Sequence, residues 1–207
     1  MTPTALKHLS TIDPVMRQLI REVGPCKLEH EPWRSPFQSL VLAVAHQQLH
    51  ATAAGNILGR FKKLFPKRRF PKSEDLAKVT DAQLRACGFS FAKIAAIRDI
   101  AVKTLDGTIP SSRQIEKLGD EEIIERLTEA RGVGRWTVEM LLIFQLGRKD
   151  VLPVDDFGVR NGFRIAYKKR GMPKPKALLK FGEKWRPHGT TAAWYLWRAA
   201  DGAKKKK

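Results

Sequence analysis

One stretch in the second half of the chain places a pair of glycines between two apolar helices and a pair of carboxylates after the second helix. Gly132 and Gly134 allow a tight turn whose backbone can come close to a ligand. A helix that begins at Arg135 directs its unpaired N–H groups toward this turn, which suits an anion such as phosphate. Asp155 and Asp156 follow, and an ionised carboxylate can stabilise a developing positive charge or orient a water molecule. The stretch therefore combines a predicted phosphate-binding turn with an acid.

Each half of this pattern also has a purely structural interpretation. A Gly-x-Gly turn is most often a helix end, and two acids at the start of a helix are most often a cap and a partner for the helix dipole. The surroundings favour function, because an amphipathic helix ends directly at Arg131 and a buried helix begins directly after the turn. Arg131 and Arg135 add positive charge that suits a DNA phosphate. The length between Trp136 and Asp156 lets the chain run out along one helix and back, so we expect the acid near the turn.

The charge balance indicates a polyanionic partner. The 207 residues include 39 Lys and Arg but 21 Asp and Glu, a formal net charge of +18 that exceeds what solubility requires. Nucleic acid is favoured ahead of a membrane surface. No apolar run reaches the length of a membrane span, and residues 1–10 lack the apolar core of a signal peptide. We therefore expect a soluble, intracellular monomer in the cytoplasm or nucleoid.

The two cysteines, Cys26 and Cys87, limit the cofactors. The sequence has no Cys-x-x-Cys and no cysteine after Asp156, which excludes a four-thiolate zinc site and an iron–sulfur cluster. Two reduced thiols are favoured over a disulfide between them. His46 and His50 have the spacing of a helical metal-ligand pair, but no acid accompanies them, so no metal site is expected there.

Short helices joined by Gly and Pro turns, without a convincing alternation of period two, predict an all-α fold. Polar residues interrupt the helical pattern at 47–50. The helix at 135–146 is apolar on nearly every side, so we expect it to run through the centre of the domain. The other helices are expected to start at Asp13-Pro14, Ser35-Pro36, Ala51, Ser73, Thr80, Ser90, Asp120, Asp155-Asp156 and Thr190.

The expected organisation is a single two-lobed helical unit of residues 1–203, with the active-site cleft between its lobes. We assign the central lobe to 34–154, with a helix-hairpin-helix at 120–146, and the second lobe to 1–33 plus 155–203. Residues 204–207 are a basic tail for which we expect only non-specific affinity for DNA.

Five sequence blocks, taken together, resemble a known family. They are AHQQLH at 45–50 with alanines at 53 and 54, CGFS at 87–90 followed by Lys93, GVGRWT at 132–137, LPVDD at 152–156, and WRP at 185–187 before AWYLW at 193–197. In this order they resemble the helix-hairpin-helix (HhH-GPD) DNA glycosylases, and within them the AlkA and fungal Mag type of DNA-3-methyladenine glycosylase II. The resemblance covers most of the chain, from about Trp33 to Trp197.

The resemblance implies base excision DNA repair by base flipping. A monofunctional glycosylase of this type hydrolyses the N-glycosidic bond of alkylated purines, such as 3-methyladenine and 7-methylguanine, in damaged double-stranded DNA and leaves an abasic site. Bifunctional relatives carry a lysine at the position of Trp136, so neither a Schiff base nor lyase activity is expected. The family pattern places the catalytic acid at Asp156 and leaves Asp155 as the helix cap. Cleavage builds positive charge on the sugar, which a carboxylate stabilises.

The resemblance also implies a pocket for the flipped base and contacts to DNA. An aromatic face attracts a cationic base, so the pocket candidates are Trp136 first, then Phe37 and Trp185. At the interruption of the helical pattern, Gln48 is the expected plug that fills the gap left by the base, Leu49 is the competing wedge, and His50 is a donor to the minor groove or a phosphate. The hairpin contacts are assigned to Gly132, Val133, Gly134, Arg135 and Thr137. The main-chain carbonyls expected to hold a monovalent cation, Na⁺ or K⁺, are those of Thr128, Ala130 and Val133.

Two other functions remain open at this point. Helix-hairpin-helix elements also serve non-catalytic DNA-binding proteins, although the acid at 156 and the tryptophan at 136 argue against that class. A glycosylase for deaminated or etheno-modified bases would need different pocket contacts, which the sequence does not reveal.

Overall fold

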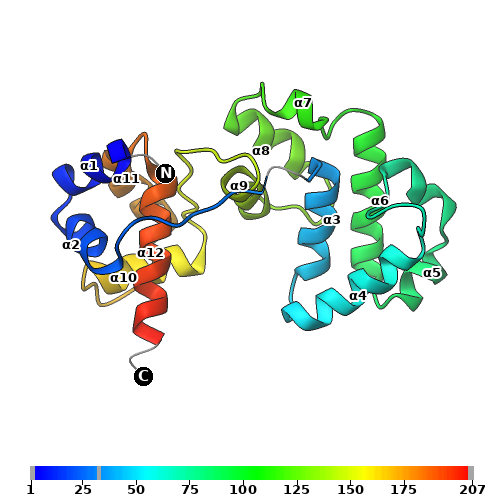
Figure 1. Cartoon of the computed structure of the whole chain (residues 1–207), viewed down its shortest axis with the longest axis horizontal. Coiled ribbons are helices and arrows are strands. Elements are labelled where there is room, and N and C mark those ends of the chain that lie inside the picture. The colour runs from blue at the N-terminus through cyan, green and yellow to red at the C-terminus, as the bar shows by residue number, and fades with distance from the viewer. Residues whose placement is uncertain (1–2, 32–33, 205–207) are drawn as a thin grey trace. The chain divides into compact units, whose positions relative to one another are not determined.

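The computed structural model describes residues 3–31 and 34–204 (Figure 1). These residues form α- and 3-10 helices and no β-strand, which confirms the all-α prediction. No helix among them is long and apolar enough to cross a bilayer. Trp33 and residues 205–207 of the expected basic tail lie outside the described residues.

The chain divides into two compact units. Unit 1 comprises Met1–Pro32 and Leu142–Lys207, and unit 2 comprises Trp33–Leu141. The central lobe expected at 34–154 extends beyond unit 2 at its C-terminal end.

The helices of unit 2 are α3 (Pro36–His46), α4 (Ala51–Lys63), η1 (Ser73–Lys78), α5 (Asp81–Ala86), α6 (Phe91–Leu105), α7 (Ser112–Ile115), α8 (Asp120–Thr128) and the first part of α9 (Arg135–Phe144). Unit 1 contains α1 (Pro3–Ile12), α2 (Pro14–Val23), the end of α9, α10 (Phe157–Ala166), α11 (Pro175–Gly182), η2 (Glu183–Trp185) and α12 (Gly189–Lys204).

Local capping sets most helix starts. Ser35, Thr80 and Ser90 each accept a hydrogen bond from the N–H three residues on, as the sequence predicts. Ser73 and Asp120 were expected as caps but are instead the first residues of η1 and α8. In η1 the side chain of Asp75 reaches back to the N–H before the helix, and in α8 the residue before Asp120 already has the extended backbone of a cap.

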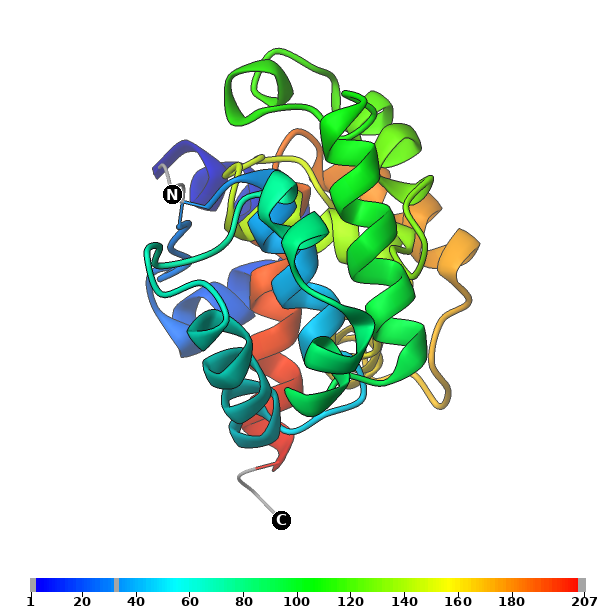
Figure 2. The same cartoon turned by 90° about the vertical axis from the view of Figure 1, so that its right-hand side faces the viewer.

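Unit 2 is organised around α6, which packs against α3 and η1 (Figure 1 and Figure 2). Its apolar stripe of Ile94, Ile97 and Ile100 is buried, and Phe61 of α4 meets Phe89 edge to face at 5.5 Å. Helix α6 also carries Lys93, which bonds the loop after α3, and Asp99, which bonds the turn before α9. The packing of α6 therefore positions the candidate site in this unit.

Unit 1 is built on the contact between α10 and α12, with α1 and α2 packed on α12. The two helices cross at backbone distance, because a Cβ added at Gly162 would lie 1.8 Å from the carbonyl oxygen of Leu196. Only glycine fits there. The crossing fixes α12 against the start of α10.

A buried carboxylate, Asp13, joins α2, the end of α10 and η2 in unit 1. Its Oδ1 caps α2 by accepting from the N–H groups of Val15 and Met16 at 3.0 and 3.3 Å. Its Oδ2 accepts from Tyr167 Oη at 2.5 Å and Trp185 Nε1 at 3.0 Å, and Lys184 Nζ lies 2.9 Å away. Burial alone raises the pKa of Asp13, but the hydrogen bonds from Tyr167, Trp185 and Lys184 outweigh it and lower the pKa below its ordinary value.

Asp13→Asn is expected to lower the free energy of unfolding at neutral pH by about 2 kcal/mol, because it removes the buried anion that Tyr167 Oη, Trp185 Nε1 and the partly exposed Lys184 ammonium share. A carboxyl whose pKa is lower in the folded than in the unfolded protein stabilises the fold above its unfolded pKa, and this is lost as the pH falls through the folded value. Urea unfolding of wild type and variant should therefore converge below about pH 4. A difference that stays constant from neutral to acid pH would contradict this role of Asp13.

The thiols of Cys26 and Cys87 are both free. Burial raises the pKa of each of them, which keeps them protonated and unreactive at neutral pH.

Candidate functional site

The predicted hairpin of unit 2 lies between α8 and α9. Gly132 has a left-handed φ of +76°, and the N–H of Val133 donates to the carbonyl of Ala130 at 3.0 Å. The N–H of Arg131 donates to Asp99 Oδ2 of α6 at 2.7 Å, so α6 fixes the turn.

The hairpin presents backbone donors at the start of α9. Within the described part of the chain, the N–H groups of Gly132, Gly134 and Arg135 have no acceptor, and all three residues are exposed. Thr137 is buried, and its N–H donates to the carbonyl of Gly134 at 2.9 Å. The turn therefore offers a set of amides at the positive end of a helix, which is an arrangement that binds phosphate.

The side chain of Arg135 is engaged by acids of its own unit. Its Nη1 and Nη2 bond both carboxylate oxygens of Glu121 at 3.0 and 2.6 Å, and its Nε lies 3.1 Å from Glu139 Oε1. Hydrogen bonding to Arg135 holds the pKa of Glu121 below its ordinary range. The sequence suggested that Arg135 adds positive charge beside the turn, but the structure pairs its guanidinium with two carboxylates, so the residue offers the turn its N–H group.

The interruption at 47–50 forms a loop between α3 and α4. Gln48 has a left-handed φ of +57° and an exposed side chain, Leu49 is 39% exposed, and His50 is exposed. Gln47 Nε2 donates to the carbonyl of Gly132 at 2.8 Å, which ties the loop to the hairpin. Three of the predicted DNA contacts thus lie on one exposed loop held against the turn.

Lys93 supports this loop from α6. Its Nζ donates to the carbonyls of Ala45 and Gln47, each at 2.8 Å. Burial lowers the pKa of Lys93. The ammonium bonds two carbonyls at the end of α3, which explains why a lysine follows the CGFS block of the sequence.

Two of the pocket candidates lie in unit 2 in different surroundings. Trp136, in the first turn of α9, is 47% exposed. Phe37 is buried and meets Phe70 edge to face at 6.5 Å. Trp136 is therefore accessible from solvent in part, whereas Phe37 packs in the core of its unit.

The predicted catalytic acid, Asp156, lies in unit 1 at the start of α10. Its Oδ1 accepts from the N–H of Val159 at 2.7 Å and from Trp197 Nε1 at 2.8 Å. The expectation that Asp155 caps the helix is therefore wrong: Asp155 is exposed and Asp156 is the cap. The extended backbone directly before Phe157 is that of Asp156, so its carboxylate is the one that reaches the N–H three residues on.

The hydrogen bond from Trp197 orients this carboxylate and was not predicted from the sequence. The indole comes from α12 and stacks on Phe144 with ring centroids 5.8 Å apart and planes inclined by 22°. A Cβ at position 158 would lie 2.8 Å from Trp197 Cδ1, so Gly158 makes room for the indole beside the acid. The small residue two positions after Asp156 is the one sequence signal of this close approach. Phe144, which stacks on Trp197 and is 40% exposed, was also not singled out from the sequence as a residue of the site.

Trp185, the third pocket candidate, belongs to the core of unit 1. Its side chain is fully buried, donates to Asp13, and meets the Phe181 ring edge to face at 5.5 Å. With no exposed surface, this indole stabilises the unit and does not line a pocket.

The hairpin carbonyls suit a hard cation chemically. The carbonyl of Ala130 accepts the N–H of Val133, which leaves it a second lone pair. Within the described residues, the carbonyls of Thr128 and Val133 have no donor. Oxygen ligands of this kind bind alkali and alkaline-earth cations. No cluster of three or more His, Cys, Asp or Glu side chains that could hold a metal ion occurs among the described residues.

Comparison with known proteins identifies the family. Residues 41–187 match the family model of the HhH-GPD superfamily base excision DNA repair protein. The chain is 43% identical over 198 residues to DNA-3-methyladenine glycosylase 1 of Schizosaccharomyces pombe, covering 93% of this chain and 85% of that protein.

Solved structures agree. That of the S. pombe 3-methyladenine DNA glycosylase in complex with abasic DNA matches with a TM-score of 0.80 at 43% identity, over 94% of this chain and 95% of the other. The DNA-3-methyladenine glycosidase of Bacillus halodurans matches with a TM-score of 0.89 at 35% identity, over 99% and 92%. The chain therefore belongs to the HhH-GPD superfamily of base excision DNA repair proteins and is of the AlkA and Mag type.

Proposed function

We propose that the protein is a DNA glycosylase of base excision repair that hydrolyses the N-glycosidic bond of alkylated purines in double-stranded DNA and leaves an abasic site. The observation that carries this proposal is the carboxylate of Asp156, held in one orientation by the N–H of Val159 and the indole of Trp197. The relative at 43% identity, which bears the name DNA-3-methyladenine glycosylase 1, supports the choice of substrate class.

Hydrolysis of this glycosidic bond depends on a negatively charged carboxylate rather than on a proton donor. As the glycosidic bond breaks, positive charge develops on the sugar, and a carboxylate beside the sugar stabilises it and can orient the attacking water. Purines alkylated at N3 or N7 are already cationic, so they leave as neutral molecules without a proton donor. This accounts for a site with one assigned carboxylate.

A cationic base also explains an exposed tryptophan. Stacking of a cation on an aromatic face contributes roughly 0.5–2 kcal/mol, and we propose that Trp136 of unit 2, which is 47% exposed, provides that face. The same residue stands where bifunctional relatives carry their lysine. An indole forms no Schiff base, so we propose that the enzyme is monofunctional, without lyase activity.

The DNA contacts follow from the exposed donors of unit 2. We propose that the amides of Gly132, Gly134 and Arg135 bind a backbone phosphate. We also propose that Gln48 fills the gap left by the flipped base, with Leu49 as the alternative wedge. His50 would donate to the minor groove or a phosphate. A monovalent cation on the carbonyls of Thr128, Ala130 and Val133 would bridge the turn to the phosphate.

The direct test is mass spectrometry of the bases released from methylated duplex and from duplexes that carry deaminated or etheno-modified bases. We expect 3-methyladenine and 7-methylguanine in the released fraction, and strand breaks only after alkali treatment. A protein that binds duplex but releases no base would be a non-catalytic binding module. Release confined to deaminated or etheno bases would replace the proposed substrate class, and strand breaks without alkali would contradict the monofunctional assignment.

A further inference from the structure

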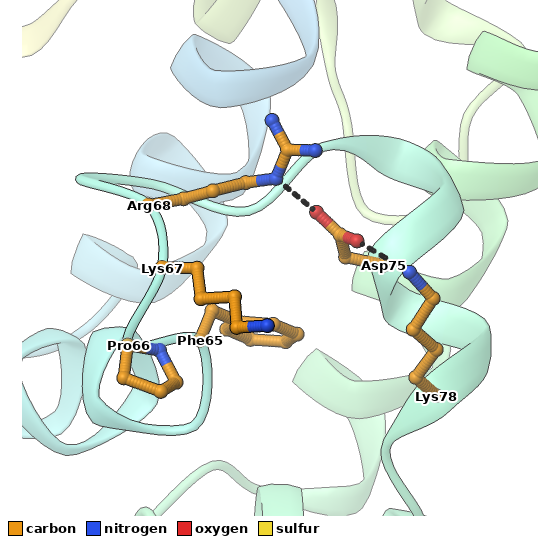
Figure 3. A pocket seen from close by; sticks show the side chains of 6 residues that line it. All are labelled: Phe65, Pro66, Lys67, Arg68, Asp75 and Lys78. Carbon is orange, nitrogen blue, oxygen red and sulfur yellow. Dashed lines mark hydrogen bonds and ion pairs between the residues drawn. The ribbon is translucent and has the colours of Figure 1, made fainter.

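A pocket in unit 2 shares no residue with the hairpin or the 47–50 loop. It has a volume of about 480 Å³ and lies between the loop after α4 and the helix η1 (Figure 3). Its lining residues are Phe65, Pro66, Lys67, Arg68, Asp75 and Lys78. The volume is in the range of ligand-binding pockets, and three of the six side chains are cationic.

The single acid of this pocket organises the cations. The carboxylate of Asp75 accepts from the N–H of Lys72 and from Lys78 Nζ, each at 3.0 Å, and Arg68 Nε lies 3.2 Å from it. The N–H of Lys72, followed by the Lys78 ammonium, holds the pKa of Asp75 below its ordinary value. The carboxylate therefore stays ionised at neutral pH and fixes the positions of Arg68 and Lys78.

Donors for an anion remain after this pairing. The ion pair joins Nε of Arg68 to Asp75, and of the two terminal nitrogens of the guanidinium one points away from the carboxylate and the other lies on its side (Figure 3). Within the part of the chain that the structure describes, neither those nitrogens nor Lys67 Nζ has a partner. A guanidinium held through Nε presents its remaining N–H groups as a fork, which matches the oxygens of a phosphate.

The surroundings favour an extended anion over a small one. Four further cations flank the pocket on exposed positions, Lys62, Lys63, Arg69 and Lys72. Phe65 and Pro66 give the pocket an apolar side against which the sugar or base of a nucleotide can pack. The combination of a cationic fork, an aromatic ring and a flanking basic tract is typical of a site that follows a nucleic-acid strand.

We propose that this pocket is a second phosphate-binding site, which takes a phosphodiester of the nucleic-acid backbone outside the tract bound by the hairpin. The inference rests on the DNA binding contained in the proposed function. It assigns part of the basic excess of the chain to a defined place and predicts a footprint on DNA longer than the hairpin and loop alone would give.

The test compares two double variants with the same charge change. Lys67→Gln with Arg68→Gln empties the pocket of its free donors. Arg113→Gln with Lys117→Gln removes two exposed cations of unit 2 outside the pocket. Fluorescence anisotropy with an undamaged duplex over a series of NaCl concentrations gives the dependence of log K on log salt. For the pocket variant, the slope of log K against log salt should be shallower than that of wild type by about 1, which corresponds to the loss of one phosphate contact. The control should keep the wild-type slope.

Equal slopes for the pocket variant and the control would overturn the proposal. Melting temperatures in sodium phosphate and NaCl at equal ionic strength separate the two sources of phosphate. Stabilisation of wild type but not of the pocket variant by inorganic phosphate, with equal slopes on DNA, would assign the pocket to free phosphate and reject the strand. Base release is measured separately. If wild type releases base but the pocket variant has the wild-type salt slope, only the pocket proposal is refuted. If the pocket variant has a shallower salt slope but wild type releases no base, only the proposed glycosylase activity is refuted.

Discussion

Asp156→Asn is expected to lower the rate of base release by about a thousandfold while leaving affinity for duplex DNA unchanged. Asparagine retains a side-chain oxygen that can accept from the N–H of Val159 and from Trp197 Nε1, so the helix cap and the indole stay in place. The negative charge beside the sugar is lost. Single-turnover release of 3-methyladenine and equilibrium binding to the same duplex measure the two effects separately.

Asp155→Asn is the matched control, because it removes the same charge one residue earlier from an exposed side chain that caps nothing. This variant should release base at close to the wild-type rate. If Asp156→Asn were as active as that control, the acid at the start of α10 would be structural, and the proposed chemistry would have to be abandoned.

The second large effect is expected at Gly162, where alanine should lower the free energy of unfolding by more than about 3 kcal/mol. The added Cβ would lie 1.8 Å from the carbonyl oxygen of Leu196, and backbone atoms have no alternative rotamer to move into. Helices α10 and α12 would have to separate. Because α12 carries Trp197 and α10 begins after Asp156, base release should fall together with stability. Urea unfolding followed by tryptophan fluorescence measures the first effect.

Gly59→Ala provides the control for the same chemical change. Gly59 lies in α4, and a Cβ there meets nothing within 4 Å. Alanine should stabilise that helix by up to about 1 kcal/mol, since glycine is a poor helix former. Equal stability of wild type and Gly162→Ala would show that α10 and α12 are not in backbone contact.

Helix starts governed by a local cap could be predicted from the sequence. Ser35, Thr80 and Ser90 bond an N–H three residues on, so the signal and its effect lie within one turn. Three α-helices were not predicted. The basic segment 168–184 conceals α11, of which Leu178 alone among the apolar residues is fully buried. Helix α1 precedes the first strong cap, and α7 is only four residues long.

The candidate site was less predictable, because its contacts depend on tertiary structure. Either of two adjacent acids can cap a helix, and which one does so depends on the backbone at Asp156. The bond from Trp197 to that acid joins residues 41 positions apart and requires the close crossing of α10 and α12. Trp185 and Trp136 have the same side chain, yet one is fully buried on Asp13 and the other is 47% exposed. Arg135 was expected to add positive charge beside the turn, but Glu121, 14 residues earlier in the chain, pairs with its guanidinium.

The loop at 47–50 has a thermodynamic consequence for DNA binding. Gln48 is held in a left-handed conformation that is unfavourable for a side-chain-bearing residue. The preceding residue, Gln47, is fixed by two hydrogen bonds: its carbonyl accepts from Lys93, and its side chain donates to the carbonyl of Gly132. Ordering a free backbone costs roughly 1–2 kcal/mol per residue at room temperature. For this loop that entropy is lost when the protein folds, so the insertion into DNA that we propose would not require this loss again.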